Sequence, residues 1–328
     1  MANITEVARL AGVSHQTVSR VLNNEDTVRP QTRARVEEAI KQLRYRPSSV
    51  ARALATRKSG TIGLISTGNP LYGPASTALA FNEAARESGY QVTTASMGKA
   101  DRAAILTAVD ILLRQQVEAI VLIATDNSSI EAVDGLELDV PFVTADSSGH
   151  GNFPTVSINQ FDGGTVATAY LADLGHREIV HLAGPIGSLD ASERERAWRA
   201  EITRRGLAVR EPLHGDWTAD CGRALGERLL VEGGVLAVFA ANDQMALGLM
   251  HALSDNGLRV PQDVSIVGFD DIPEAAHFTP PLTTVRQDFT ELGRRMMATV
   301  SEVLGGKPVA KPVLSSPKLI IRSSALHI

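Results

Sequence analysis

From residue 61 onward, short apolar runs alternate with longer stretches of helical periodicity. The runs read TIGLIS, YQVTTAS, AIVLIAT and PFVTAD, then EIVHLAG, VLAVFAAND and VSIVGFDD, and spans of roughly 10 to 20 residues separate them. Strands that alternate with helices form parallel sheets, because each helix returns the chain to the edge where the next strand starts. The pattern therefore predicts an α/β fold in which the parallel arrangement occurs twice.

Polar residues stand where several of these runs end, and we expect them to line a ligand site. Asp146, Asn242, Asp243 and Asp270 occupy such positions. Ligands of open parallel sheets bind beyond the carboxyl ends of the strands. Two facing lobes would place these side chains around one cleft. The simpler alternative is that each acid or amide only caps the helix after its strand.

The first sixty residues have another pattern, that of short helices joined by a tight turn. Asn3 and Glu6 form a capping box at the start of a helix. The apolar residues of that helix recur at helical spacing: Ile4, Val7, Ala8, Leu10 and Ala11. Gly12 tolerates the positive φ of a turn, and Ser14 is a suitable N-cap for a second helix that starts at His15.

The second helix has an apolar and a polar side. Val18, Val21 and Leu22 form its inward stripe, and the outward residues are His15, Gln16, Thr17, Ser19, Arg20 and Asn23. Arginine reads guanine and glutamine reads adenine in the major groove, and short hydroxyls bind phosphates. Residues 1–60 hold 11 Lys and Arg against 5 Asp and Glu, whereas the whole chain has a net charge of −5. A basic head on an acidic body favours DNA binding over a plain three-helix bundle with a solvated polar face.

A third helix is predicted from Pro30 to near Tyr45, with Val36, Ala39, Ile40 and Leu43 on its buried side. After Pro47 comes the Ala-rich segment SSVARALATRKSG. A helix of about two turns is marginal in water, so we expect this segment to become ordered only on contact with a partner.

Composition excludes several classes of protein. No apolar run reaches the roughly 18 residues of a membrane helix, and the N-terminus lacks a secretory signal, so we expect a cytoplasmic protein. Cys221 is the only cysteine, which leaves neither a disulfide nor a structural zinc site. His176 and His181 are assigned to structure or solvent contact, and Trp198 to packing. A Gly-rich phosphate loop and a nucleophile elbow are also missing, so we expect neither an enzyme nor a cofactor.

Several stretches together resemble the LacI family of bacterial transcription regulators. They are ITEVARLAGVSHQTVSRVLNN, TRARVEEAIKQLRYRPSSVARALATRKSGTIGLI, AANDQMALG, VSIVGFDD and PPLTTVRQDF, in the family's order. The resemblance implies a helix-turn-helix domain over 1–46, a hinge helix and linker over 47–59, and a two-lobed core like periplasmic binding proteins over 60–328. The N-lobe would comprise about 60–158 plus 289–317, and the C-lobe about 159–286 plus 318–328.

The resemblance also assigns DNA contacts. Leu54 would be the hinge leucine that enters the minor groove at the centre of a pseudo-palindromic operator, one from each chain of a homodimer. His15 and Gln16 fall on the pair that sets operator preference, and Arg20 on a base-reading position. Positions that contact the DNA backbone are Ser14, Thr17, Ser19, Asn23 and Tyr45.

For the cleft, the resemblance implies a sugar effector. Asp146, Arg194, Asn242 and Asp270 fall on positions that bind sugar hydroxyls. Trp217 falls on a stacking position, and Phe289, Gln287 and Pro74 on the pocket wall. Asp190 belongs to the same set, although a sugar-binding member of the family has serine there. The LIATDN stretch departs too, because the strand end around Ile123 has no asparagine where the same sugar-binding member of the family has one.

The expected function is a repressor that releases its operator when a sugar, preferably a galactoside, binds. A glucoside or other disaccharide is the alternative, and a corepressor such as a purine or a phosphocarrier protein would reverse the response. The chain ends at LIIRSSALHI without a Leu-heptad tail, so we expect a dimer. Another class, an extracytoplasmic sugar-binding transport protein, shares the two-lobed body, but the basic head argues against it.

Overall fold

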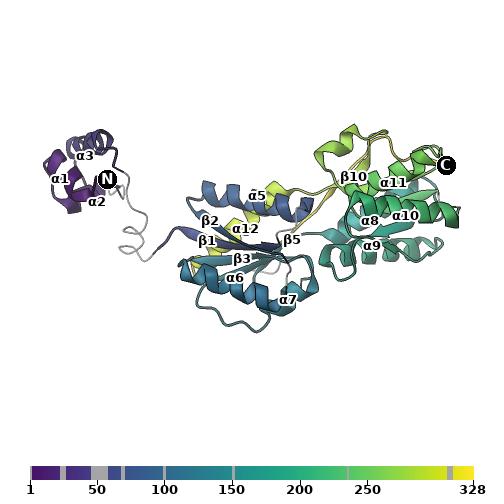
Figure 1. Ribbon diagram of the computed structural model, residues 1–328, viewed down its shortest axis with the longest axis horizontal. Helices are drawn as coiled ribbons and strands as arrows, with labels where there is room; N and C mark the ends of the chain where they lie inside the picture. The colour runs from purple at the N-terminus through teal and green to yellow at the C-terminus, as the bar shows by residue number, and fades with distance from the viewer. Residues whose placement is uncertain are drawn as a thin grey trace. The chain divides into compact units, whose positions relative to one another are not determined.

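Two units make up the chain, Met1–Gly60 and Thr61–Ile328. The computed structural model (Figure 1) describes residues 2–22, 27–45, 58–67, 71–98, 101–149, 152–234, 236–308 and 313–328. None of the helices in these ranges is both long and apolar enough to cross a bilayer.

The first unit contains three helices, α1 (Ile4–Ala11), α2 (His15–Leu22) and α3 (Pro30–Gln42). Both halves of the Asn3–Glu6 capping box form, and Gly12 ends α1 with φ +63°. The small core comprises Val7, Ala8, Ala11, Val18, Val21, Val36 and Ala39. Leu10 was predicted with the apolar stripe but is 50% exposed. The third helix ends at Gln42, short of Tyr45, because the chain turns at Arg44 with φ +47°.

The first lobe of the second unit is a six-stranded sheet in the order β11-β5-β4-β3-β1-β2, paired in parallel throughout. Its strands are β1 (Thr61–Thr67), β2 (Gln91–Met97), β3 (Ala119–Ile123), β4 (Phe142–Ala145), β5 (Thr155–Ile158) and β11 (Val313–Ser315). Its helices are α5 (Tyr72–Glu87), α6 (Arg102–Arg114), α7 (Asn127–Val133) and α12 (Phe289–Leu304). Helices α5 and α12 cover one face and α6 and α7 the other, each over its own apolar cluster.

The second lobe repeats this arrangement in the order β12-β10-β9-β8-β6-β7. Its strands are β6 (Val180–Ala183), β7 (Leu213–His214), β8 (Ala237–Ala240), β9 (Ser265–Asp270), β10 (Thr283–Arg286) and β12 (Lys318–Ile320), of which β12 runs antiparallel to β10. Its helices are α8 (Gln160–Asp173), α9 (Leu189–Arg205), α10 (Ala219–Glu232), α11 (Asp243–Asp255) and the short 3-10 helix η1 (Pro273–His277). Helices α10 and α11 pack on one face and α8 and α9 on the other.

The buried aromatic and imidazole groups of the second lobe are structural. Trp198 is fully buried and its Nε1 donates to the Ile179 carbonyl at 3.0 Å. His181 stacks on Phe239 and on Trp198. Complete burial lowers the pKa of His181 to about 3, so this imidazole is neutral at physiological pH. His176 is 2% exposed and belongs to the interior as well.

The chain crosses between the lobes three times: from β5 to α8 at Asn159, from β10 to α12 at residues 287–288, and from β11 to β12 at residues 316–317. A further connection lies away from these crossings. Leu189 at the start of α9 is 4% exposed and packs within the apolar cluster of the first lobe. Beside it, the Leu189 amide donates to the Thr125 carbonyl and the Asn127 amide to the Gly187 carbonyl, in a short antiparallel bridge. The lobes therefore contact each other through backbone and side chains.

All seven predicted runs form strands, four in the first sheet and three in the second. Strands β5, β7, β10, β11 and β12 were not predicted. They are two to four residues long, and β5 and β10 are rich in threonine and serine, so they carry little apolar signal.

Candidate functional site

The polar side of α2 is the candidate surface in the first unit. His15, Gln16 and Arg20 are exposed, while Thr17 and Ser19 are half-buried. Ser14 caps the helix by accepting the Thr17 amide at 3.2 Å, and the two hydroxyl oxygens lie 3.0 Å apart. The core residues Val18 and Val21 occupy the opposite side of α2. The amphipathic pattern therefore holds Gln16 and Arg20 where they can contact a large ligand.

A shallow groove next to this surface was not predicted. Arg20, Arg29 and Arg35 line it together with the hydroxyls of Ser14, Thr17, Thr27 and Thr32. Three guanidinium groups with hydroxyl donors form an electropositive surface suited to phosphate. Arg29 directly precedes α3 and Arg35 lies within that helix, and the excess of arginine around Pro30 was the available signal.

The remaining predicted DNA-contact residues are Tyr45, Asn23 and Leu54. Tyr45 is half-buried against the helical core, and its backbone amide donates to the Ile40 carbonyl at 3.0 Å. Asn23 and the hinge residue Leu54 lie outside the described residues.

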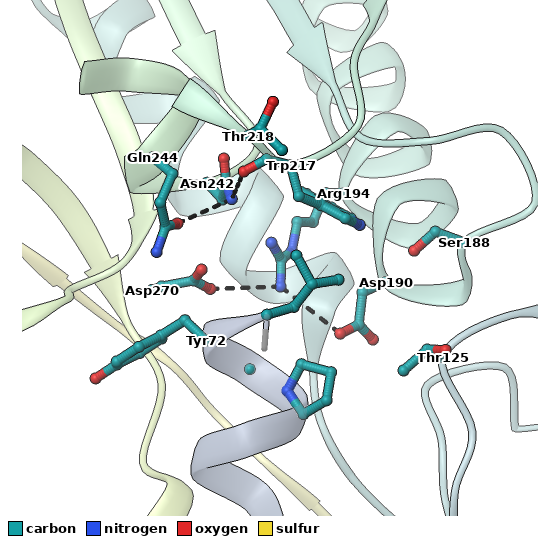
Figure 2. A pocket seen from close by; sticks show the side chains of 13 residues that line it. Tyr72, Thr125, Ser188, Asp190, Arg194, Trp217, Thr218, Asn242, Gln244 and Asp270 are labelled. Carbon is teal, nitrogen blue, oxygen red and sulfur yellow. Dashed lines mark hydrogen bonds and ion pairs between the residues drawn. The ribbon is translucent and has the colours of Figure 1, made fainter. Parts of the chain in front are cut away.

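Between the lobes of the second unit lies a cavity of about 280 Å³. Six of the predicted residues line this main cavity: Pro74, Asp190, Arg194, Trp217, Asn242 and Asp270. Figure 2 shows Arg194 between the carboxyl groups of Asp270 and Asp190, with Trp217 and Asn242 beside them. The carboxyl ends of β8 and β9 deliver Asn242 and Asp270, as expected for parallel sheets.

Arg194 is the centre of a buried polar network. Its Nη2 lies 3.7 Å from Asp270 Oδ1 and 3.8 Å from Asp190 Oδ2. Its Nε donates to Gln160 Oε1 at 2.9 Å, and Nη1 donates to the Ala241 carbonyl. The guanidinium carbon lies 3.8 Å from the centre of the Phe269 ring. Burial of this side chain, 3% exposed, is tolerable because every nitrogen has a partner.

The network continues into two of the lobe crossings. Gln287 donates to Asp270 Oδ1 at 2.7 Å, and Gln160 donates to Gln287 Oε1 at 2.8 Å. Gln160 opens α8 after one crossing, and Gln287 precedes α12 at another. Cavity-lining groups and crossing points are therefore joined by direct hydrogen bonds.

Burial raises the pKa of Asp270 to about 6, although Arg194 and the Gln287 hydrogen bond lower it in part. Asp243 differs from the prediction that it lines the cleft. It is fully buried beneath the cavity, where it accepts from Thr284 Oγ1 at 2.6 Å and from the Ile272 amide at 2.9 Å. Burial and the nearby Asp270 raise the pKa of Asp243 well above its ordinary value. Asp243 thus supports the loop after β9 rather than the cavity wall.

Trp217 is held in an uncommon backbone conformation with φ +77°. Its carbonyl accepts from Asn242 Nδ2 at 3.0 Å, and its ring packs on Gly184, where a Cβ atom would collide with it. A left-handed non-glycine residue costs on the order of 1–3 kcal/mol and persists where its surroundings fix it. Gly184 and Asn242 therefore aim the indole at the cavity.

A side compartment of about 50 Å³ shares Gly73, Pro74, Thr125 and Asp190 with the main cavity. The remaining predicted residues, Asp146, Gln287 and Phe289, line it. Asp146 Oδ1 accepts from the Ser148 amide and hydroxyl, and Ser147 donates to Asp190 Oδ1 at 2.6 Å. Both cavities have walls from both lobes.

Several lining residues were missed. They are Leu71, Tyr72, Thr125, Ser188, Thr218 and Gln244 in the main cavity and Ser157 and Gln160 in the side compartment. Most lie in the first turn of a helix or in the loop before it. A search for polar residues one to three positions after each strand would have found Thr125 after β3, but not Gln160, because Gln160 follows β5, which was not predicted.

We expect Gly184→Ala to displace the Trp217 indole, because the new methyl group occupies the space of the ring. Tryptophan fluorescence with acrylamide quenching measures this, since the second tryptophan, Trp198, is fully buried. Quenching should increase in the variant. The control is Gly98→Ala, where a methyl group meets open space. Equal quenching of both variants and the parent would contradict the packing role of Gly184.

Comparison with known proteins identifies the chain's relatives. Residues 3–48 match bacterial regulatory proteins of the lacI family, and residues 168–325 match the periplasmic binding protein-like domain. The chain is 35% identical over 323 residues to the lactose operon repressor of Escherichia coli K12, across 98% of this chain and 90% of the relative. It is 32% identical over 340 residues to the transcriptional repressor PurR of Haemophilus influenzae, across 100% of each protein.

Solved structures agree with this. A lac repressor dimer bound to operator and the anti-inducer ONPF matches with a TM-score of 0.91 at 34% identity, covering 99% of each chain. The transcriptional regulator CelR in complex with cellobiose matches with a TM-score of 0.72 at 32% identity, covering 99% of this chain and 100% of the other. Because the relatives are repressors rather than enzymes and match over nearly the whole chain, this protein belongs to the LacI family and is a DNA-binding transcription repressor.

Proposed function

We propose that this repressor releases its operator when a sugar, preferably a galactoside, binds between the lobes of the second unit. The observation that carries the proposal is the main cavity, in which Trp217 stands beside Asp190, Arg194, Asn242 and Asp270. A sugar ring has an apolar C–H face that stacks on an aromatic ring and hydroxyl groups that bond to carboxylates and amides. Both kinds of group are held in place by the contacts described above.

The proposed mechanism depends on walls contributed by both lobes. Effector contacts to Pro74 from α5 and to Asp270 from β9 change with the distance between the lobes, so the effector prefers one lobe arrangement. That preference is coupled to the DNA-binding head. We infer a homodimer that binds a pseudo-palindromic operator in the cytoplasm through His15, Gln16 and Arg20, with Leu54 in the minor groove. Phosphate contacts are assigned to Ser14, Thr17, Ser19, Asn23 and Tyr45.

A purine corepressor is the second candidate, favoured by the 32% identity with PurR across the full chain. It would strengthen operator binding rather than weaken it. The cavity carries more acceptors than a purine base has N–H donors, and these acceptors match a polyhydroxyl ligand better. A glucoside or another disaccharide is the alternative within the sugar class, as in the CelR–cellobiose complex.

The test is a titration of Trp217 fluorescence with lactose, allolactose, galactose, cellobiose and hypoxanthine, with operator release measured in parallel on palindromes near the protein's own gene. A galactoside that binds and releases DNA is the expected result. Binding of hypoxanthine with tighter DNA binding would overturn the sugar proposal.

We expect Arg20→Ala to relax specificity at one guanine and to cost about 1–3 kcal/mol of operator binding, the value of a bidentate contact. Electrophoretic mobility shifts on an operator series and on random DNA measure this. Lys41→Ala removes the same charge from the exposed side of α3 and serves as the control. Equal losses on operator and random DNA for Arg20→Ala would show that this arginine binds phosphate only.

Asp270→Ala should leave operator binding intact and abolish the response to sugar, because it removes an acceptor from the cavity and a partner from Arg194. DNA release at saturating effector is the measurement. A normal response in this variant would place the effector elsewhere.

Effector affinity should depend on pH through Asp270. Its pKa of about 6 lies above the ordinary 3.8, so the carboxylate is present above pH 6 and is lost as the pH falls through that value. A hydroxyl that donates to this carboxylate then binds more weakly, by up to about tenfold per pH unit below 6. Calorimetry between pH 5 and 7.5 measures the effect, and Asp270→Asn should bind weakly without this pH dependence. A constant affinity in the parent protein would contradict the assignment.

A further inference from the structure

The side compartment is built for a positively charged group. Asp146 is 5% exposed, and its Oδ2 atom is buried without a hydrogen-bond partner among the described residues. An unpaired buried carboxylate oxygen is costly and calls for a donor. Asp190 stands in the same compartment, linked to Ser147, the residue after Asp146, by a 2.6 Å hydrogen bond. Two carboxyl groups thus share a space of about 50 Å³.

Within the described residues, the lining of the compartment itself supplies no cation to this pair. Its described lining residues include no Lys, Arg or His. Arg194 forms an ion pair with Asp190 from the main cavity, at 3.8 Å, comparable with its 3.7 Å contact to Asp270, and the Asp190 side chain is 45% exposed. The uncompensated group is therefore Asp146, whose Oδ2 atom has no hydrogen-bond partner among the described residues. The amide groups of Gln160 and Gln287 bond to each other. The existing donors are therefore committed elsewhere.

The volume of the side compartment and the number of hydrogen-bond donors on a ligand group indicate which group fits there. A volume of about 50 Å³ accommodates a group little larger than a water molecule. A hydroxyl offers one O–H donor, whereas an ammonium offers three N–H donors and a charge. Two carboxylates that share a site are stabilised by a nearby positive charge and are opposed by a negative one. A phosphorylated or acidic sugar is therefore excluded by the same argument.

We propose that the side compartment binds a protonated amine, and that the effector is an amino-substituted glycoside. The ring occupies the main cavity against Trp217 while its ammonium group enters between Asp146 and Asp190. This inference rests on the proposed sugar-responsive function and narrows its ligand class. It makes Asp190 the residue that sets the preference for an amine.

The test compares matched ligands by calorimetry at pH 7.0. The pairs are galactosamine with galactose, glucosamine with glucose, and β-1,4-linked diglucosamine with cellobiose. The N-acetyl derivatives, which keep the nitrogen but lose its charge, and galactose 6-phosphate complete the panel. At least one amine should bind about tenfold or more tightly than its parent sugar and its N-acetyl form, the usual scale of one charge-assisted contact, and galactose 6-phosphate should not bind.

Variants assign the preference to the compartment. Asp190→Asn keeps an acceptor for Ser147 but removes the charge, so the ratio of amine affinity to parent-sugar affinity should fall to about one, whatever the change in the parent-sugar affinity itself. Glu211→Gln removes an equal charge from an 86% exposed side chain outside both cavities and should retain the preference. A retained preference in Asp190→Asn would overturn the assignment.

The two proposals fail in different ways. If neutral sugars bind and release DNA but no amine binds more tightly, the amine inference is wrong and the sugar-responsive function stands. If neither sugars nor amino sugars bind while hypoxanthine does, both proposals are wrong.

Discussion

The buried guanidinium of Arg194 is the interaction on which the cleft depends. A charge at 3% exposure is stable only when it is paired with other groups. Here Nε and Nη1 donate to Gln160 of α8 and to the Ala241 carbonyl after β8, and Nη2 lies 3.7 and 3.8 Å from the carboxylates of Asp270 and Asp190. Because Gln160 and Gln287 extend the network into two lobe crossings, the cavity and the crossings share one set of hydrogen bonds. A ligand that changes the partners of Arg194 also changes what holds the crossings.

Regular features of the fold could be read from the sequence because they carry strong local signals. Seven apolar runs became seven of the twelve strands in the two sheets. The Asn3–Glu6 capping box begins the first helix and Gly12 ends it. The edge strands β7, β11 and β12 are too short to show a period, since their place is set by pairing with neighbours. Leu10 has the spacing of the core residues but is 50% exposed, so helical spacing alone did not decide which side of α1 is buried.

The residues of the candidate site were also predictable only in part. Strand ends and family positions predicted nine cavity-lining residues from Pro74 to Phe289, and all nine line one of the two cavities. Asp243 also follows a strand end yet is fully buried, because its carboxyl group accepts hydrogen bonds from Thr284 Oγ1 and from the Ile272 amide. Sequence position gives the end of a strand but not the side to which a side chain turns. Gln160 was missed because its partners, Arg194 and Gln287, are 34 and 127 residues away.

Contacts between the lobes other than the crossings bear on how a ligand acts. Leu189 lies in the apolar core of the first lobe although it begins a helix of the second, and the adjacent residues 125–127 and 187–189 form a backbone bridge. Ser188 and Thr125, on this bridge, also line the main cavity, and Asp190 follows at once. Moving the lobes apart would break the bridge and expose Leu189, so the arrangement changes in a step rather than gradually. A ligand held by Asp190 therefore acts at the point where the lobes either remain in contact or separate.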